Sequence, residues 1–157
     1  MTFEEIKSVT PFKANLFIDW LNIKKNGGNG LNFGALFSLI RNVGGMIVRA
    51  NIYLPDRNEG EIKFYDALKR YGFKLVIINE RRGSANCDSK MAVDIVTQSL
   101  DVDVIYLLCN DADYLPAVEY LQTMGKRVLL IHVDGCSNDL RDAVDEWRHA
   151  GQLNLLQ

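Results

Sequence analysis

The sequence predicts an α/β fold: a three-layer sandwich with a five- or six-stranded, mostly parallel sheet between two layers of helices. Two observations lead to this prediction. Short apolar runs alternate with segments of helical periodicity along nearly the whole chain. Most of these runs are apolar at every position, which is typical of strands buried on both faces of a parallel sheet. A strand–helix–strand rhythm of this kind closes through right-handed crossovers.

The expected strands are the runs richest in Val, Ile, Leu and Phe, each bounded by Gly or by charged residues. They cover residues 14–19, 46–54, 73–79, 103–109 and 127–133. The expected helices cover residues 31–43, 59–71, 88–100, 113–124 and, after the fifth strand, 138–149. Gly44, Gly72 and Gly125 are the expected ends of three of these helices.

Length and composition limit the classes of protein that this chain can belong to. The 157 residues predict one domain, 1–157, and 48% hydrophobic with 24% charged residues excludes a disordered chain. A net charge of −2 provides no global basic field for nucleic acid, so RNA binding would need a local patch. No apolar run approaches the roughly 18 residues that a membrane span needs. We therefore expect no membrane partner and a cytoplasmic location.

The cysteines and histidines have no metal-binding spacing. Cys87, Cys109 and Cys136 are widely separated and form no CxxC pair, which argues against a disulfide framework and against a thiolate zinc site. His132 and His149 are isolated in the sequence and show no HxH or HxxxH spacing. His132 is therefore expected to be a strand residue.

Acidic residues follow several expected strands, and this is the first functional signal. In open parallel sheets, ligands bind beyond the carboxyl ends of the strands. The residues that follow the strands include Asp19, Asn22, Asp56, Glu80, Asp88, Asp111, Asp113 and Asp134. Carboxylates that converge repel one another unless they take up protons or bind a cation. An oxygen-only set of ligands suits Mg²⁺ or Mn²⁺ rather than zinc.

Helix capping is the main alternative for these acids. Asp88 and Asp113 each precede a helical pattern and are equally well explained as N-caps, and Pro116 in the first turn fits Asp113 as a cap. Asp19 and Asp111 are harder to explain this way, because each ends an apolar strand and is followed by an expected loop.

Asp94 lies among apolar residues inside an expected helix. A buried charge there is costly unless it is paired or liganded. An ion pair with Lys90, four residues earlier, is the structural alternative to a functional role. Metal-assisted attack on a phosphodiester needs only carboxylates, which suits a sequence without a GxSxG elbow, a P-loop or a credible Cys–His pair.

Three elements of the sequence resemble the NYN domain family. They are "FIDWLNI" at 17–23, "CDSKMAVDIV" at 87–96 and "CNDADYLPAVEYLQTMGKRV" at 109–128. The family comprises PIN-like proteins and includes the LabA/DUF88 group of bacterial proteins. The resemblance runs from about residue 14 to 149. It departs from the family pattern at Ala85-Asn86, at Cys109-Asn110, where Ser-Gly is usual, and at Tyr114, where the family has another aromatic residue.

The resemblance implies a sheet of order 3-2-1-4-5 and a Mg²⁺- or Mn²⁺-dependent ribonuclease activity. That strand order places Asp19 beside Asp111. The resemblance also implies a catalytic metal site of Asp19, Asp94 and Asp111, with Asp88 and Asp113 as further metal ligands. The residues expected to bind the RNA substrate are Asn22, Arg81, Arg82, Lys90 and Ser137.

Two roles remain open at this point. Trp20 either stacks on a base at the mouth of the cleft or is buried against the loop "KKNGGNG" (24–30), which is expected to be a mobile lip over the site. The alternative function is a non-catalytic module of the same fold that binds RNA or a protein and acts in regulation. Carboxylates too far apart to share a metal pair would favour that alternative. PIN-like relatives often dimerise, but nothing in the sequence marks a homodimer interface.

Overall fold

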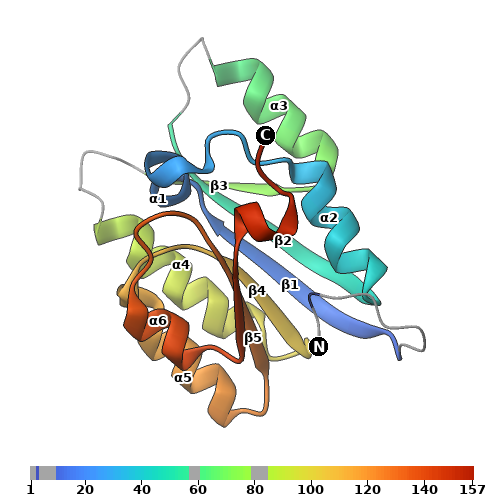
Figure 1. The fold of residues 1–157 in the computed structure, drawn as a ribbon, viewed down its shortest axis with the longest axis vertical. Helices are drawn as coiled ribbons and strands as arrows, with labels where there is room; N and C mark the ends of the chain where they lie inside the picture. Colours follow the sequence, from blue (N-terminus) through green and yellow to red (C-terminus); the bar gives the residue numbers. More distant parts are fainter. Residues whose placement is uncertain (1–2, 4–9, 57–60, 79–84) are drawn as a thin grey trace.

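The protein folds into a three-layer α/β sandwich, shown here by a computed structural model that describes residues 3, 10–56, 61–78 and 85–157, without the side chains of 85–88 (Figure 1). Within this part of the chain the sheet has six strands in the order β3-β2-β1-β4-β5-β6, and every neighbouring pair is parallel. The strands are β1 (Phe12–Asp19), β2 (Gly45–Pro55), β3 (Lys74–Ile78), β4 (Val104–Leu108), β5 (Arg127–His132) and β6 (Glu146–His149). The predicted order 3-2-1-4-5 is confirmed.

Two groups of helices cover the two faces of the sheet. One face carries α1 (Trp20–Ile23), α2 (Phe33–Asn42), α3 (Ile62–Tyr71) and the 3-10 turn η5 (Ala150–Leu153). The other face carries α4 (Ala85–Gln98), α5 (Leu115–Thr123) and α6 (Asn138–Ala143), and the two groups lie on opposite sides of the sheet in Figure 1. No helix among the described residues is long and apolar enough to span a bilayer.

The central strands β1 and β4 form the middle of the core. Every residue of β4 is buried, and so is every residue of β1 from Ala14 to Asp19. Leu16 and Ile18 face the cluster under α2, whereas Phe17 faces the cluster under α4. Burial on both faces explains why these strands are apolar at every position.

The predicted helix over 138–149 is wrong in its second half. Helix α6 ends at Ala143, and the chain becomes extended at Val144, where ψ is 161°. Asp145 then pairs with Val128, because its carboxylate accepts a 2.7 Å hydrogen bond from the Val128 N–H and its own N–H donates to the Val128 carbonyl. The residues that follow become β6, since hydrogen bonding to β5 outweighs their helical pattern.

The loop expected to be a mobile lip is joined to two other segments. Residues Lys24–Gly28 form a π-helical turn, η1, in which Gly27 has a φ of +97°. The Asn26 carbonyl accepts a hydrogen bond from the Asp134 N–H at 3.1 Å, and Gly30 accepts one from Gln157 at 3.2 Å. Backbone hydrogen bonds therefore connect this loop to the β5–α6 connection and to the C-terminal residues.

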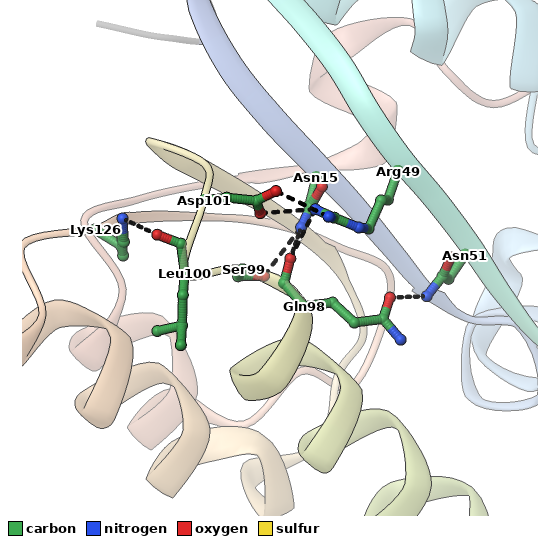
Figure 2. A network of polar contacts seen from close by, with 8 residues as sticks. All are labelled: Asn15, Arg49, Asn51, Gln98, Ser99, Leu100, Asp101 and Lys126. Carbon is green, nitrogen blue, oxygen red and sulfur yellow. Dashed lines mark hydrogen bonds and ion pairs between the residues drawn. The ribbon is translucent and has the colours of Figure 1, made fainter.

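A polar network connects the C-terminal end of α4 to β1 and β2 (Figure 2). The Asn15 amide donates to the Gln98 carbonyl at 2.8 Å and to the Ser99 hydroxyl at 3.2 Å. Arg49 donates to the same Gln98 carbonyl and forms a bidentate ion pair with Asp101, at 2.8 and 2.9 Å. The hydrogen bond from Arg49 lowers the pKa of the Asp101 carboxyl. This network fixes the end of the helix that carries Asp94.

Candidate functional site

Asp19 is both the last residue of β1 and the N-cap of α1. Its carboxylate is 2% exposed. Oδ1 accepts a hydrogen bond from the Asn22 N–H at 3.3 Å, and Oδ2 accepts one from the Tyr114 hydroxyl at 2.9 Å. The expectation that no helix follows Asp19 directly is wrong, because a four-residue helix begins at the next residue. A helix this short leaves almost no periodic signal in a sequence.

Asp111 is also a cap. Its Oδ1 accepts a 2.9 Å hydrogen bond from the Asp113 N–H, at the start of the 3-10 turn η4 (Ala112–Tyr114). Asp113 lies inside this turn and is exposed, so the interpretation of Asp113 as the N-cap is wrong. Pro116 does occupy the first turn of α5, where its missing N–H costs little.

Asp19 and Asp111 lie on neighbouring strand ends, as the resemblance implied. Ile18 pairs with Leu108, which places Cys109 next to Asp19. The Cys109 thiol is completely buried, and burial raises its pKa well above the ordinary value; the charges of Asp19 and, more weakly, Asp111 raise it further. Both carboxylates therefore act on the same thiol. Cys109 stays protonated and neutral, which excludes it as a nucleophile.

Asp94 lies on α4 and faces β2. It is 4% exposed, and its Oδ2 accepts a 2.8 Å hydrogen bond from the Tyr53 hydroxyl. Oδ1 forms a 2.9 Å ion pair with Lys90, so the ion pair proposed as a structural alternative is present. Tyr53 is the register partner of Asp19 in the β1–β2 pair. Asp94 is thus bonded to the residue that pairs with Asp19.

Asn22 carries a buried amide oxygen in this region. Its N–H caps Asp19, and its carbonyl accepts a 2.8 Å hydrogen bond from the Asn26 amide. The side-chain Oδ1 is buried and has no hydrogen-bond partner. A buried acceptor without a donor is costly, and such atoms are characteristic of positions where a ligand or ion binds.

Asn110 is a site residue that the sequence did not indicate. It is buried; its Oδ1 accepts from the Val133 N–H at 3.0 Å, and its Nδ2 donates to the Asp134 carbonyl at 2.6 Å. Its own carbonyl accepts from the Ser137 N–H at 3.0 Å. Asn110 thereby holds the β5–α6 connection against the end of β4. Ser137 lies in this connection and caps α6, accepting from the Leu140 N–H at 3.4 Å.

The two histidines, isolated in the sequence, are neighbours in the structure. His132 ends β5, which confirms its placement in a strand, and it pairs in register with His149 of β6, with ring centroids 5.3 Å apart. His149 contacts Asp134 through Nε2 at 2.9 Å and accepts from the Gly151 N–H through Nδ1. These nitrogens are engaged within the protein, and the histidines belong to no metal-binding group among the described residues.

Several predicted residues have other surroundings or lie outside the description. Trp20 is 5% exposed and packs against Phe33 and Phe64, with ring centroids 5.5 and 5.4 Å away, so the alternative of burial is correct and base stacking is not. Arg81, Arg82 and the side chain of Asp88 lie outside the described residues. Lys90 is half-exposed and bound to Asp94.

The donors at this edge of the sheet fit a divalent cation by their chemistry. Asp19, Asp111 and the free amide oxygen of Asn22 are the oxygen ligands that Mg²⁺ and Mn²⁺ prefer. The acids alone do not suffice: among the side chains that the structure describes, no three His, Cys, Asp or Glu residues are grouped so as to hold a metal. The amide oxygen of Asn22 is therefore an essential part of any such site.

The fold and the strand-end acids define an α/β domain of the PIN-like type. The model of the NYN domain matches residues 13–150, and the chain belongs to the NYN domain family. A crystal structure of a protein of unknown function from Vibrio parahaemolyticus superimposes with a TM-score of 0.80 over 97% of this chain and 100% of that one. Its 21% sequence identity shows a shared fold. No curated protein matches this chain.

Proposed function

We propose that this chain is a ribonuclease that hydrolyses RNA phosphodiester bonds at the edge formed by Asp19, Asp94 and Asp111, with Mg²⁺ or Mn²⁺ as cofactor. One observation carries the proposal: two carboxylates, Asp19 and Asp94, are buried at the same edge of the sheet. Burying a charge is costly and is rarely kept without a compensating role. Membership of the NYN domain family supports the nuclease activity.

The roles of the residues follow from their surroundings. Asp19, Asp111 and the Asn22 amide oxygen would hold the cation. A bound divalent cation would lower the pKa of a water molecule and offset the charge that develops on the phosphate. Asn110 holds the connection with Ser137 next to Asp111. We further propose that Asp88 and Asp113 assist in cation binding and that Arg81, Arg82, Lys90 and Ser137 contact the RNA.

The test compares Asp19→Asn and Asp111→Asn with the wild-type protein on single-stranded RNA in Mn²⁺. Each substitution removes one charge and keeps a side chain that can accept the capping hydrogen bond. We expect each variant to lose at least about 100-fold in cleavage rate, because even the residues around metal ligands contribute up to about that much. Asp101→Asn, at the opposite end of α4, should cleave normally. Full activity in both variants, together with no Mn²⁺ binding in calorimetry, would refute the proposal.

A regulatory RNA-binding module is the second candidate function. It is favoured by the partners of the buried acids: both oxygens of Asp94 and both oxygens of Asp19 already accept hydrogen bonds or an ion pair from the chain itself. Such a module would bind RNA equally well with and without EDTA and would not cleave it. A filter-binding assay with and without EDTA separates the two functions.

A further inference from the structure

The ion pair between Lys90 and Asp94 joins a buried acid to a half-exposed base. The Asp94 side chain is 6% exposed, whereas the Lys90 side chain is 53% exposed. The Nζ–Oδ1 distance is 2.9 Å, and the two residues are one helical turn apart on α4. Pairs of this type contribute only about 0.3–0.5 kcal/mol to a helix. Stability alone is therefore a weak reason for this arrangement.

The other oxygen of Asp94 is held from inside the protein. Oδ2 accepts from the Tyr53 hydroxyl, and Tyr53 is fully buried. The Tyr53 oxygen accepts from the Asn51 amide at 3.3 Å, and the same amide donates to Gln98 Oε1 at 2.9 Å, the contact drawn in Figure 2. This chain of hydrogen bonds fixes the Asp94 carboxylate between α4 and β2. Solvent therefore approaches Asp94 from the side of Lys90.

We propose that the Lys90 ammonium competes with the divalent cation for Asp94, so that the ion pair and a cation bound to Asp94 exclude each other. The inference rests on the proposed function, because it concerns the cation of the proposed nuclease. Without a cation, Lys90 neutralises the buried carboxylate and the fold needs no metal. With a cation, Lys90 has to leave Oδ1, because two positive charges cannot share this oxygen without strong repulsion. Asp94 stays in place, held by Tyr53.

The test is a calorimetric titration with Mn²⁺ of the wild-type protein and the variant Lys90→Met. Methionine keeps a long side chain on an exposed helix position and removes the competing charge. We expect Mn²⁺ to bind about tenfold more tightly to Lys90→Met at about 0.15 M salt. Lys126→Met is the matched control, because Lys126 donates to the backbone carbonyl of Leu100 and not to a carboxylate. It carries the same change in net charge and should bind Mn²⁺ as the wild-type protein does.

A second pair of proteins shows whether the effect passes through Asp94. In an Asp94→Asn background, Lys90→Met should change Mn²⁺ affinity no more than Lys126→Met does. Equal affinity of wild type and Lys90→Met overturns the competition but leaves the proposed nuclease intact. A tenfold gain that persists in Asp94→Asn also overturns it. Tighter Mn²⁺ binding by Lys90→Met with no RNA cleavage by any variant supports the competition and refutes the nuclease. Absence of Mn²⁺ binding in every protein refutes both.

Discussion

The Tyr114 hydroxyl donates a 2.9 Å hydrogen bond to Oδ2 of Asp19, although 95 positions separate the two residues in the sequence. Both side chains are buried. The bond joins the turn before α5 to the end of β1, and together with the Asn22 N–H it engages both oxygens of the carboxylate. Asp19 is therefore oriented by a residue of a distant segment, and the first predictions concern this region.

Tyr114→Phe should lower the free energy of unfolding by about 1.5–3 kcal/mol, the usual contribution of a hydrogen bond to a charged group. The ring and its packing are kept, so the loss reports on the hydroxyl. Tyr65→Phe is the control, because the Tyr65 hydroxyl donates to the neutral Pro55 carbonyl at 2.6 Å. Its loss should be about 0.5–1.5 kcal/mol. Urea denaturation measures both, and a smaller loss at Tyr114 than at Tyr65 contradicts the prediction.

Asp111→Ala and Asp111→Asn should separate capping from charge. Alanine removes the acceptor for the Asp113 N–H and should cost about 1 kcal/mol of unfolding free energy, whereas asparagine caps as well as aspartate and should cost little. Thermal or urea unfolding gives the comparison. Equal losses in the two variants would mean that Asp111 stabilises the fold through its charge and not through its capping hydrogen bond.

Trp20→Ala should destabilise the protein by about 3–5 kcal/mol, because it leaves a cavity among Phe33 and Phe64. Trp147→Ala is the comparison, since Trp147 is 40% exposed and should cost clearly less. Urea denaturation of both variants tests this expectation. A stable Trp20→Ala variant with a selective loss of RNA affinity would restore the base-stacking role.

His132 should make stability depend on pH below about 6.5, the ordinary pKa of histidine. Burial lowers the His132 pKa; nearby His149 and Arg141 lower it further, whereas Asp134 and a hydrogen bond with the Val133 carbonyl raise it. As the pH falls through 6.5, roughly, the unfolded chain takes up a proton that the folded protein does not, so stability falls. At neutral pH and above both states are neutral, and the effect vanishes.

His132→Phe should remove this dependence. The unfolding free energy of the variant relative to wild type should rise in favour of the variant between about pH 7.5 and pH 5. Denaturant titrations at the two pH values measure the change. A difference that stays constant across this range would show that His132 titrates alike in the folded and unfolded states.

Much of the fold could be predicted from the sequence because its signals are local or periodic. Apolar strands such as β4 and helices such as α5 have lengths and boundaries that hydrophobic periodicity and glycine reveal. The family motifs then led to the strand order. Helix α1 was missed because four residues are too few to show a period, and β6 was missed because its pairing with β5 depends on Asp145 reaching Val128.

The sequence by itself determined which residue types follow the strands, and therefore that carboxylates gather at one edge of a parallel sheet. Only the tertiary structure decided which partners those carboxylates have. The Tyr114 hydroxyl at Asp19, the Tyr53 hydroxyl and Lys90 at Asp94, and the Asn110 clamp are contacts of this kind. Most of them join segments far apart in the chain, and their geometry depends on how helices pack on the sheet. A buried charge takes its properties from such neighbours, and these contacts therefore determine whether Asp19 and Asp94 accept a cation.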